Sequence, residues 1–372
     1  MQLNDFKLER FFARYEFKAP YLLCCSDCEA MTIQDLLNLQ EGSQEEFLQT
    51  WLGYTESTGS PELREQVASL YQNIAPDQVL VHTGAEEAIH NFVLSQLQAG
   101  DHVIVQTPCY QSLLELPRAC GGIVSPWPLH PTADGWEADL GELKNLINKN
   151  TRLIIINSPH NPTGHMFSLD QWQEIMRLAA GQDILLFADE VYKYLEYDQQ
   201  PLPWACDLYD HAVSLGVLSK SFGLPGLRIG WIATRNHNIY QAMARQKDYT
   251  TICNSAPSEY LATLAIRNRA AILERNRNLI TGNLRLLDEF FQRHEEHFSW
   301  LRPSAGPIAF PAFKESTSAT GYAEKLVEQA GILLLPGSCY DYGDRHFRIG
   351  FGRANLAVVL ARWEEWLDKQ AR

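Results

Sequence analysis

The sequence contains no apolar stretch of the roughly 20 residues that a helix needs to cross a lipid bilayer. Its longest apolar runs have the length of buried strands and lie at residues 153–156, 184–188 and 332–335. The N-terminal residues mix acidic and basic side chains and lack the apolar core of a signal peptide. We therefore expect a soluble, cytoplasmic protein that does not act at a membrane.

Positive charge is also scarce, because 31 Lys and Arg residues stand against 45 Asp and Glu residues and the formal net charge is −14. The basic residues form no dense run, whereas a nucleic-acid-binding surface needs concentrated positive charge. Neither a G-x-G-x-x-G sequence nor a Walker sequence is present. The chain therefore indicates no nucleic-acid partner, and neither a dinucleotide nor a nucleoside triphosphate as its ligand.

The eight cysteines are scattered, and a cytosolic chain of this length does not need a disulfide framework. Cys25 and Cys28 have the C-x-x-C spacing, but a structural zinc site needs two further ligands. No second C-x-x-C and no suitably spaced histidine pair exists. We expect reduced thiols that pack in the core or line a pocket, and no metal site.

Hydrophobic residues make up 45% of the 372 residues and charged residues 20%, which is typical of a globular protein with a large core. At roughly 150 residues per domain, this length corresponds to two or three domains. Helices are predicted at 61–71, 85–97 and 168–180, and strands between them at 78–82, 102–106, 152–157, 183–188, 212–215 and 228–233. This alternation favours a mainly parallel sheet covered on both faces, with ligands beyond the carboxyl ends of its strands.

A long helical pattern and then a smaller α/β pattern complete the chain. We predict an N-terminal segment at 1–50 that packs with the small domain, a large domain at 51–257, a spanning helix at 258–294 and a small C-terminal domain at 295–372.

Polar side chains follow several of the predicted strands. Asp189 comes directly after the apolar run 183–188, where an acid either caps the next element or must be paired. Lys220 lies between an apolar segment and a loop rich in Gly and Pro. Such a lysine is either solvated or desolvated with a lowered pKa, as Schiff-base chemistry requires. Asn161 lies in a turn with two prolines that is either only structural or presents an amide to a ligand.

The residues Thr83, Gly84, Ala85 and Glu86 follow another strand and open a helix. Thr83 and Glu86 fit a capping box, and capping alone would explain both residues. The same geometry leaves free N–H groups at the helix start, which form an anion site.

Together these motifs resemble those of the class I/II aminotransferases, the fold-type I enzymes that use pyridoxal 5′-phosphate (PLP). The matching motifs occur in family order: Gly-Tyr at 53–54, Thr-Gly-Ala at 83–85, Thr-Pro-Cys-Tyr at 107–110, Asn-Pro-Thr-Gly at 161–164, Asp-Glu-Val-Tyr at 189–192, Ser-Lys-Ser-Phe-Gly at 219–223 and Phe-Arg-Ile-Gly-Phe at 347–351. The resemblance implies an α/β fold with a three-layer large domain, a mainly parallel sheet and a smaller α/β C-terminal domain.

The resemblance also implies catalytic roles around the cofactor ring. Lys220 would be the Schiff-base lysine and the proton carrier, and Asp189 would keep the pyridine nitrogen protonated. Tyr192 and Asn161 would donate hydrogen bonds to the phenolic oxygen of the ring, and Tyr110 would stack on its face.

The binding roles follow from the same resemblance. The phosphate would be held by Gly84, Ala85, Glu86, Ser219 and Arg228. Tyr54 would reach the phosphate of a neighbouring subunit, which implies a homodimer with shared active sites. Arg348 would bind the substrate α-carboxylate with a bidentate fork, next to Asn161.

The chain departs from the family pattern at two places. Val217 stands where the family often has a Ser or Thr phosphate ligand, so Ser219 and Arg228 become more important. Residues 24–30 replace the usual Gly-x-x-x-Pro-Asp type of sequence in a region that commonly borders the substrate side chain.

We expect a PLP-dependent aminotransferase that acts on an α-amino acid and a 2-oxo acid by a ping-pong mechanism. The motif around Lys220 and the motif around Arg348 also resemble the branch of the family that contains capreomycidine synthase, so a PLP-dependent lyase or cyclase is the alternative. A non-catalytic PLP-binding regulatory protein is a third hypothesis, which the presence of Lys220, Asp189 and Arg348 disfavours.

Overall fold

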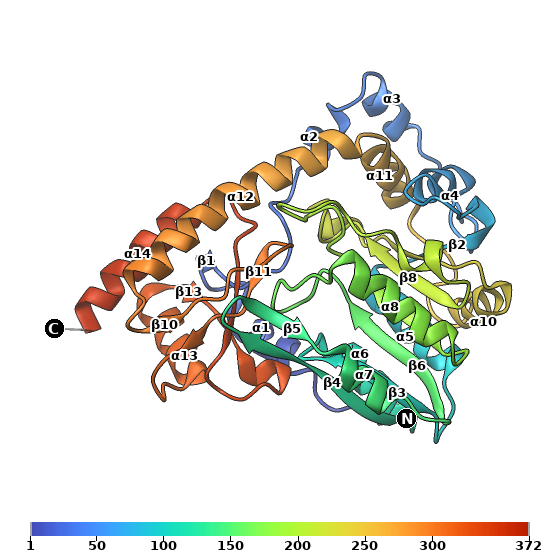
Figure 1. Cartoon of the computed structure of the whole chain (residues 1–372). Helices are drawn as coiled ribbons and strands as arrows, with labels where there is room; N and C mark the ends of the chain where they lie inside the picture. The colour runs from blue at the N-terminus through green and yellow to red at the C-terminus, as the bar shows by residue number, and fades with distance from the viewer. Residues whose placement is uncertain (1, 371–372) are drawn as a thin grey trace.

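The computed structural model describes residues 2–370, and its central feature is an eight-stranded sheet (Figure 1). The strands are, in sheet order, β2 (Val79–His82), β9 (Gly230–Ala233), β8 (Ala212–Val217), β7 (Leu185–Asp189), β6 (Thr151–Asn157), β3 (His102–Thr107), β4 (Ile123–Thr132) and β5 (Gly135–Ala138). The five strands from β8 to β4 are parallel to their neighbours. The outer strands are antiparallel, since β9 pairs with β2 and β8, and β5 pairs with β4. The predicted mainly parallel sheet is confirmed.

Helices cover both faces of this sheet because its central strands are apolar on both sides. In β6, Leu153 and Ile155 pack in one core cluster while Ile154 and Ile156 pack in the other. One face is covered by α5 (Ala85–Gln96), α6 (Gln111–Ala119) and α10 (His237–Lys247). The other is covered by α4 (Pro61–Ala68), α7 (Leu140–Leu146), α8 (Leu169–Ala180) and α9 (Ala205–Leu208).

The six predicted strands lie within two residues of the observed ones. The strands β4 and β5 are absent from the prediction because proline interrupts the pattern there. Pro126, Pro128 and Pro131 all lie in β4, and proline is unusual within a strand because it cannot donate to the ladder.

The region 258–294 is predicted to be one helix, but the structure contains two helices there. The prediction of a single continuous helix is therefore wrong. The helix α11 spans Ala256–Arg267 and is followed by its C-cap residue Asn268. The helix α12 (Arg269–Arg293) begins directly after Asn268. Asn268 leaves the helical conformation, with φ −97° and ψ 19°, and its side-chain amide donates to the Leu264 carbonyl at 2.9 Å. This local hydrogen bond competes with the helix, as asparagine side chains commonly do. The long helix α12 then runs from α11 towards the C-terminal elements (Figure 1).

The C-terminal elements are β10 (Phe298–Ser299), β11 (Ile308–Ala309), β12 (Ala312–Phe313), α13 (Ala319–Ala330), β13 (Ile332–Leu333), β14 (Leu335–Pro336), the 3₁₀ turn η3 (Gly337–Tyr340), β15 (Phe347–Gly350) and α14 (Leu356–Gln370). Strands β11, β15 and β14 form a three-stranded antiparallel sheet. Helix α14 packs against α13 and α12. The division into domains at the predicted boundaries stays a prediction.

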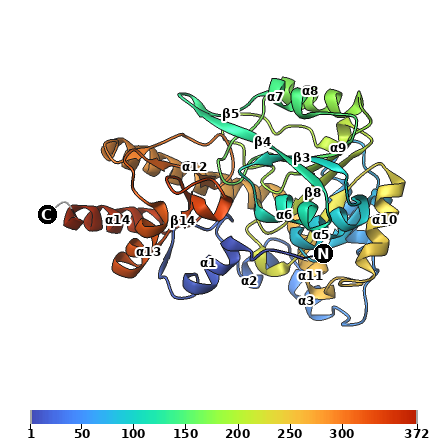
Figure 2. The same ribbon diagram turned by 90° about the horizontal axis from the view of Figure 1, so that it is seen from below.

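The first 50 residues form α1 (Lys7–Tyr15), β1 (Tyr21–Leu22), α2 (Ile33–Leu37) and α3 (Ser43–Leu48). Strand β1 pairs with β13, and α1 contacts η3. In Figure 2, α1 lies on the side of the molecule that holds α13 and β14. The helices α2 and α3 instead contact α11. Two further 3₁₀ turns, η1 (Pro76–Gln78) and η2 (Pro225–Leu227), precede β2 and β9. Among residues 2–370, no helix is both long and apolar enough to cross a membrane.

Candidate active site

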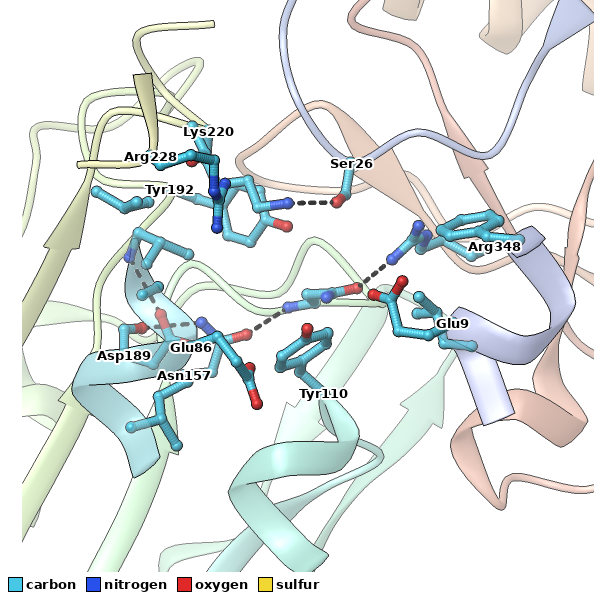
Figure 3. A pocket seen from close by; sticks show the side chains of 18 residues that line it. Glu9, Ser26, Glu86, Tyr110, Asn157, Asp189, Tyr192, Lys220, Arg228 and Arg348 are labelled. Atoms are coloured by element: carbon cyan, nitrogen blue, oxygen red, sulfur yellow. Dashed lines mark hydrogen bonds between the residues drawn. The ribbon is translucent and has the colours of Figure 1, made fainter. Parts of the chain in front are cut away.

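A cavity of about 250 Å³ opens at the carboxyl ends of the parallel strands (Figure 3). Ten predicted site residues line it: Ala85, Glu86, Tyr110, Asn161, Asp189, Tyr192, Ser219, Lys220, Arg228 and Arg348. The remaining lining residues are Leu8, Glu9, Phe12, Ser26, Ile89, Asn157, Val191 and Val217. Side chains that are far apart in the sequence therefore meet at the edge of the sheet where ligands are expected.

Asp189 is the last residue of β7 and is buried in the floor of the cavity. Its backbone carbonyl accepts hydrogen bonds from Asn157 Nδ2 at 2.8 Å and from the Ser158 amide at 3.0 Å. Its carboxylate accepts one from the Val191 amide at 3.3 Å. Burial raises the pKa of Asp189 to about 7. A carboxyl group held out of water in this way is stabilised as an anion by a cationic ligand group such as a protonated ring nitrogen.

Lys220 lies three residues beyond the end of β8, on the opposite wall of the cavity in Figure 3. Its Nζ donates a hydrogen bond to Ser26 Oγ at 2.8 Å. Burial lowers the pKa of Lys220, because desolvation disfavours the charged ammonium. A larger fraction of the amine is therefore neutral near pH 7, and the neutral amine is the form that attacks an aldehyde.

Tyr192 presents a buried hydroxyl that makes no hydrogen bond of ordinary geometry among residues 2–370, and the Ser26 hydroxyl is a polar side-chain neighbour of it. Burial raises its pKa, so the hydroxyl is protonated and available as a donor. Asn161, across the cavity, uses its amide oxygen to accept from Tyr340 at 2.9 Å and from Arg348 at 3.2 Å. Its amide nitrogen is then the group that can donate to a ligand. A buried hydroxyl without a partner fits a ligand oxygen in this place.

The start of α5 forms the second end of the cavity. Its N-cap Gly84 has φ 82° and gives the helix no side-chain cap. Of the two interpretations of this segment, the capping box is not formed: the Thr83 backbone amide donates to Glu87 Oε2 at 2.6 Å, and the Glu86 carboxylate accepts from Ser112. The side chains of Thr83 and Glu86 therefore leave the first backbone amides of α5 uncapped. This arrangement favours the interpretation that the start of α5 binds an anion.

Arg228 reaches across this helix start. It adopts the left-handed conformation, with φ 53°, at the end of η2. A Cβ atom on Gly84 would lie 2.5 Å from Arg228 Nη2, so only glycine allows this approach. A guanidinium next to uncapped helix amides fits a phosphate group. Val217 also lines the cavity, where it can offer no hydrogen bond.

Arg348 lies in β15 and is only 2% exposed. Its Nε and Nη2 donate to the Cys24 carbonyl at 3.1 and 2.6 Å, and its Nη1 also donates to Tyr340. Among the residues that the structure describes, no carboxylate forms a salt bridge with it. A buried guanidinium paired only with neutral groups fits a carboxylate from a ligand.

Two predicted residues do not line the cavity. Gly84 borders it through Arg228, as described above. Tyr54 is 87% exposed and is not among the residues that line the cavity of its own chain, so its role towards a neighbouring subunit stays a prediction. The thiols of Cys25 and Cys28 are buried but do not line the cavity, whereas Ser26 between them does.

Sequence reasoning missed Ser26, Asn157 and Glu9. Asn157 ends a predicted strand, so the rule that identified Asp189 could have identified it as well. The Asn157 side chain links Asp189 to Asn161. Its Nδ2 donates to the Asp189 backbone carbonyl, and its Oδ1 accepts from the Asn161 backbone amide at 2.7 Å. Ser26 lies in the stretch 24–30, which the resemblance already places beside the substrate side chain, although Ser26 itself is not singled out by it. Glu9 lies near the N-terminus, where no pattern indicates a contact with the cavity.

The chain is similar to proteins of known family. The family model for aminotransferase class I and II matches residues 24–362. Capreomycidine synthase of Streptomyces vinaceus is 33% identical over 318 residues, which cover 85% of this chain and 81% of that protein. The structure of a PLP-dependent aminotransferase from Streptococcus suis 89-1591 matches with a TM-score of 0.93 and 30% identity over 99% of both chains. The structure of the PLP-dependent cyclase OrfR matches with a TM-score of 0.92 and 26% identity over 100% of this chain and 98% of the other.

Proposed function

Since the chain belongs to the aminotransferase class I and II family and uses PLP, we propose that it is an aminotransferase acting on an α-amino acid and a 2-oxo acid. The two substrates would bind in turn, in a ping-pong mechanism. The observation that carries this proposal is the placement of Lys220 and Asp189 on opposite sides of one cavity, between the uncapped start of α5 and the buried Arg348 (Figure 3).

Bound PLP supplies an aldehyde that bonds to amines and a pyridine ring that withdraws electrons from the neighbouring carbon. The orphaned Tyr192 hydroxyl and the cradle at Gly84 support the fit of this group. In our proposal Lys220 is the Schiff-base lysine, and its burial keeps enough neutral amine for that bond. Asp189 would keep a proton at the ring nitrogen, and Tyr192 would donate to the phenolic oxygen.

The phosphate would be held by the amides of Ala85 and Glu86, with Gly84 making room for Arg228. Ser219 also lines this end of the cavity, and we assign it as a further phosphate ligand. We assign Tyr110 to stack on the ring; its position in the cavity lining at the start of α6 supports this role.

Arg348 and Asn161 would bind the α-carboxylate of either substrate. Both residues line the cavity, and they already contact each other at 3.2 Å. A carboxylate that binds Arg348 places the substrate's α-carbon near Lys220, which lines the same cavity. Lys220, once free, then moves the proton at that carbon.

We also propose that the active enzyme is a homodimer. Large apolar side chains are exposed at Leu48, Trp51, Leu52, Tyr54, Tyr249 and Ile252. The two stretches of this apolar patch are held together by a hydrogen bond from Thr55 to the Asn254 carbonyl at 2.9 Å. An exposed apolar patch of this kind is typical of a protein interface, and it includes Tyr54, which we assign to the phosphate of the second subunit.

A PLP-dependent lyase or cyclase of the capreomycidine synthase type is the second candidate. It is favoured by the 33% identity to capreomycidine synthase and by the TM-score of 0.92 to the cyclase OrfR. The cofactor residues serve both reactions equally, because they hold the ring and the phosphate and do not contact the substrate side chain.

A panel of amino acids, mixed one by one with the purified enzyme, tests the proposal. We expect a donor to convert the cofactor to its pyridoxamine form, seen as loss of the visible absorbance, and a 2-oxo acid to restore it. Lys220→Ala should bind PLP without turning over. Release of ammonia or another fragment without any 2-oxo acid would identify the lyase instead. A folded protein that takes up no added PLP would contradict both candidates.

A further inference from the structure

Ser26 contacts the amine of Lys220, although 194 positions separate the two residues in the sequence. The serine is almost fully buried, and its Oγ accepts the only side-chain hydrogen bond that Lys220 Nζ donates within residues 2–370. In Figure 3 it lies between Lys220 and Arg348, on the side of the cavity where the substrate carboxylate would bind. The contact therefore places the free amine towards the substrate.

The segment that carries Ser26 is held in place by backbone contacts. The Leu23 carbonyl accepts from the Gly350 amide at 3.1 Å, and the Glu29 amide donates to the Gly352 carbonyl at 2.7 Å. A Cβ atom on Gly350 would lie 1.6 Å from the Cys25 carbonyl oxygen. The segment thus packs too closely against β15 to tolerate a side chain there, and its position is well defined.

The same segment is tied to the proposed carboxylate site. The Cys24 carbonyl, two residues before Ser26, accepts two hydrogen bonds from the Arg348 guanidinium. One short stretch of chain therefore positions both Arg348, which would bind the substrate carboxylate, and Ser26, which binds the Lys220 amine.

We propose that Ser26 is a positioning residue that holds the free amine of Lys220 on the substrate side of the cavity while Lys220 carries protons. This inference rests on the proposed function, since Lys220 is free only when a substrate amine has replaced it on the cofactor. A hydroxyl that accepts from the amine restricts its rotation, and proton transfer requires that the amine face the reacting carbon.

The hydrogen bond also affects the charge of Lys220. An ammonium donates to a hydroxyl oxygen more strongly than a neutral amine does, so the contact favours the charged form. The charged groups that face Lys220 are Asp27 from the same segment, Asp189 from β7 and Arg348 from β15, and Cys25 is a further titratable neighbour. Loss of the Ser26 hydroxyl leaves those groups in place and should lower the pKa of Lys220.

The test begins with the cofactor-free protein, in which the rate of acylation of Lys220 by acetic anhydride is measured by mass spectrometry across a pH series. We expect Ser26→Ala to lower the pKa of Lys220 by about one unit. Ser26→Thr, which keeps the hydroxyl, should retain the wild-type value. This readout does not depend on turnover, so it separates failure of this inference from failure of the proposed function.

The loaded enzyme provides the second measurement. Ser26→Ala should lower kcat about tenfold with KM for the amino donor unchanged, because the amine is less well positioned while Arg348 still binds the carboxylate. Its pH–rate profile should move to lower pH, and Ser26→Thr should restore both. If Ser26→Ala does not fold, Ser26→Cys replaces it, with a smaller change in the same direction.

Glu29→Ala is the matched control. Glu29 accepts from the Ala354 amide at 2.9 Å and so anchors the segment without touching Lys220. We expect it to remove one side-chain anchor while the backbone hydrogen bonds of Leu23 and Glu29 keep Ser26 in place, so the pKa of Lys220 should not change. The proposal is overturned if Ser26→Ala leaves that pKa unchanged, if Ser26→Thr fails to restore it, or if Glu29→Ala shifts it equally.

Discussion

The proposed cofactor site depends on single residues whose charged forms are disfavoured by burial. Asp189 is the clearest case, because burial raises its pKa to about 7 in the chain alone. In an unfolded chain the same carboxyl titrates near its ordinary value of about 3.9. The folded state therefore binds a proton more tightly, and stability decreases as pH rises between these two values. The folded protein is therefore less stable near neutral pH when no cationic group of a bound ligand faces the ionised Asp189 side chain.

Asp189→Asn should reveal this conflict. In the cofactor-free protein, the neutral amide removes the cost of burying a charge, so the variant should be more stable than wild type by roughly 1–3 kcal/mol at pH 8. The gain should shrink as the pH falls below 7. Chemical denaturation at several pH values measures it, and an equal gain at every pH would contradict the argument.

Activity should change in the opposite direction. Asp189→Asn cannot hold the ring nitrogen protonated as a carboxylate does, so kcat should fall by about 10²-fold or more. The Asn variant keeps the size of the side chain, so PLP uptake, followed by absorbance, distinguishes an electronic defect from an empty site.

At the scale of elements, the site forms where the N-terminal segment packs directly against β15. The two backbones lie so close that a side chain between them would not fit. Strand β15 carries Arg348, and its glycine Gly350 leaves room for the N-terminal segment. Helix α1 lines the cavity through Leu8, Glu9 and Phe12. It is held there by a salt bridge from Lys7 to Asp341 and by a hydrogen bond from the Lys7 backbone amide to Gln111 in α6 at 2.9 Å. The N-terminal residues therefore belong to the site rather than to a peripheral arm.

Gly350→Ala should release the segment at 23–29. The added Cβ atom would lie 1.6 Å from the Cys25 carbonyl oxygen, so the backbone must move. We expect a loss of roughly 2–4 kcal/mol and faster amide exchange in that segment, measured by hydrogen exchange, with the eight-stranded sheet still protected.

Gly282→Ala is the matched control for this substitution. Gly282 is exposed within α12, and a Cβ atom there would meet nothing within 4 Å. The substitution should stabilise the protein by about 0.5–1 kcal/mol, because glycine is a poor helix former. Similar losses for both variants would contradict the account of Gly350.

At the scale of the whole molecule, the single chain leaves an apolar patch uncovered, defined above by six exposed side chains from Leu48 to Ile252. Trp51 is 78% exposed and Tyr54 is 87% exposed. Our proposal is that a second copy covers this patch and that Tyr54 then reaches the cavity of that partner. We therefore expect the enzyme to sediment at twice the 42.3 kDa mass of the chain.

Hybrid dimers test whether Tyr54 acts across the interface. Tyr54→Ala should weaken PLP binding about tenfold, as expected for the loss of one hydrogen bond to a charged group. Lys220→Ala subunits are inactive alone. When the two variants are co-expressed at limiting PLP, a hybrid dimer in which Tyr54 acts on its partner contains one intact site and regains activity. If Tyr54 served its own subunit, every site in the hybrid would carry a defect and no activity would return.

The sequence alone determined the parts that depend on neighbouring residues. Alternating apolar runs specify strands buried on both faces, so the parallel sheet could be predicted. The polar residues that follow those runs, Asp189, Asn161 and Lys220, lie at the strand ends for the same reason. The motifs around them were specific enough to indicate both the family and PLP.

The tertiary structure alone decided the parts that depend on distant segments. The break at Asn268, the missing cap at Thr83 and the place of Ser26 result from contacts that no local pattern encodes. Ser26 reaches Lys220 only because the N-terminal segment packs against β15, more than 300 residues away in the sequence. Such long-range packing is selected by the total free energy of the folded chain, so it becomes visible only when all the segments are assembled.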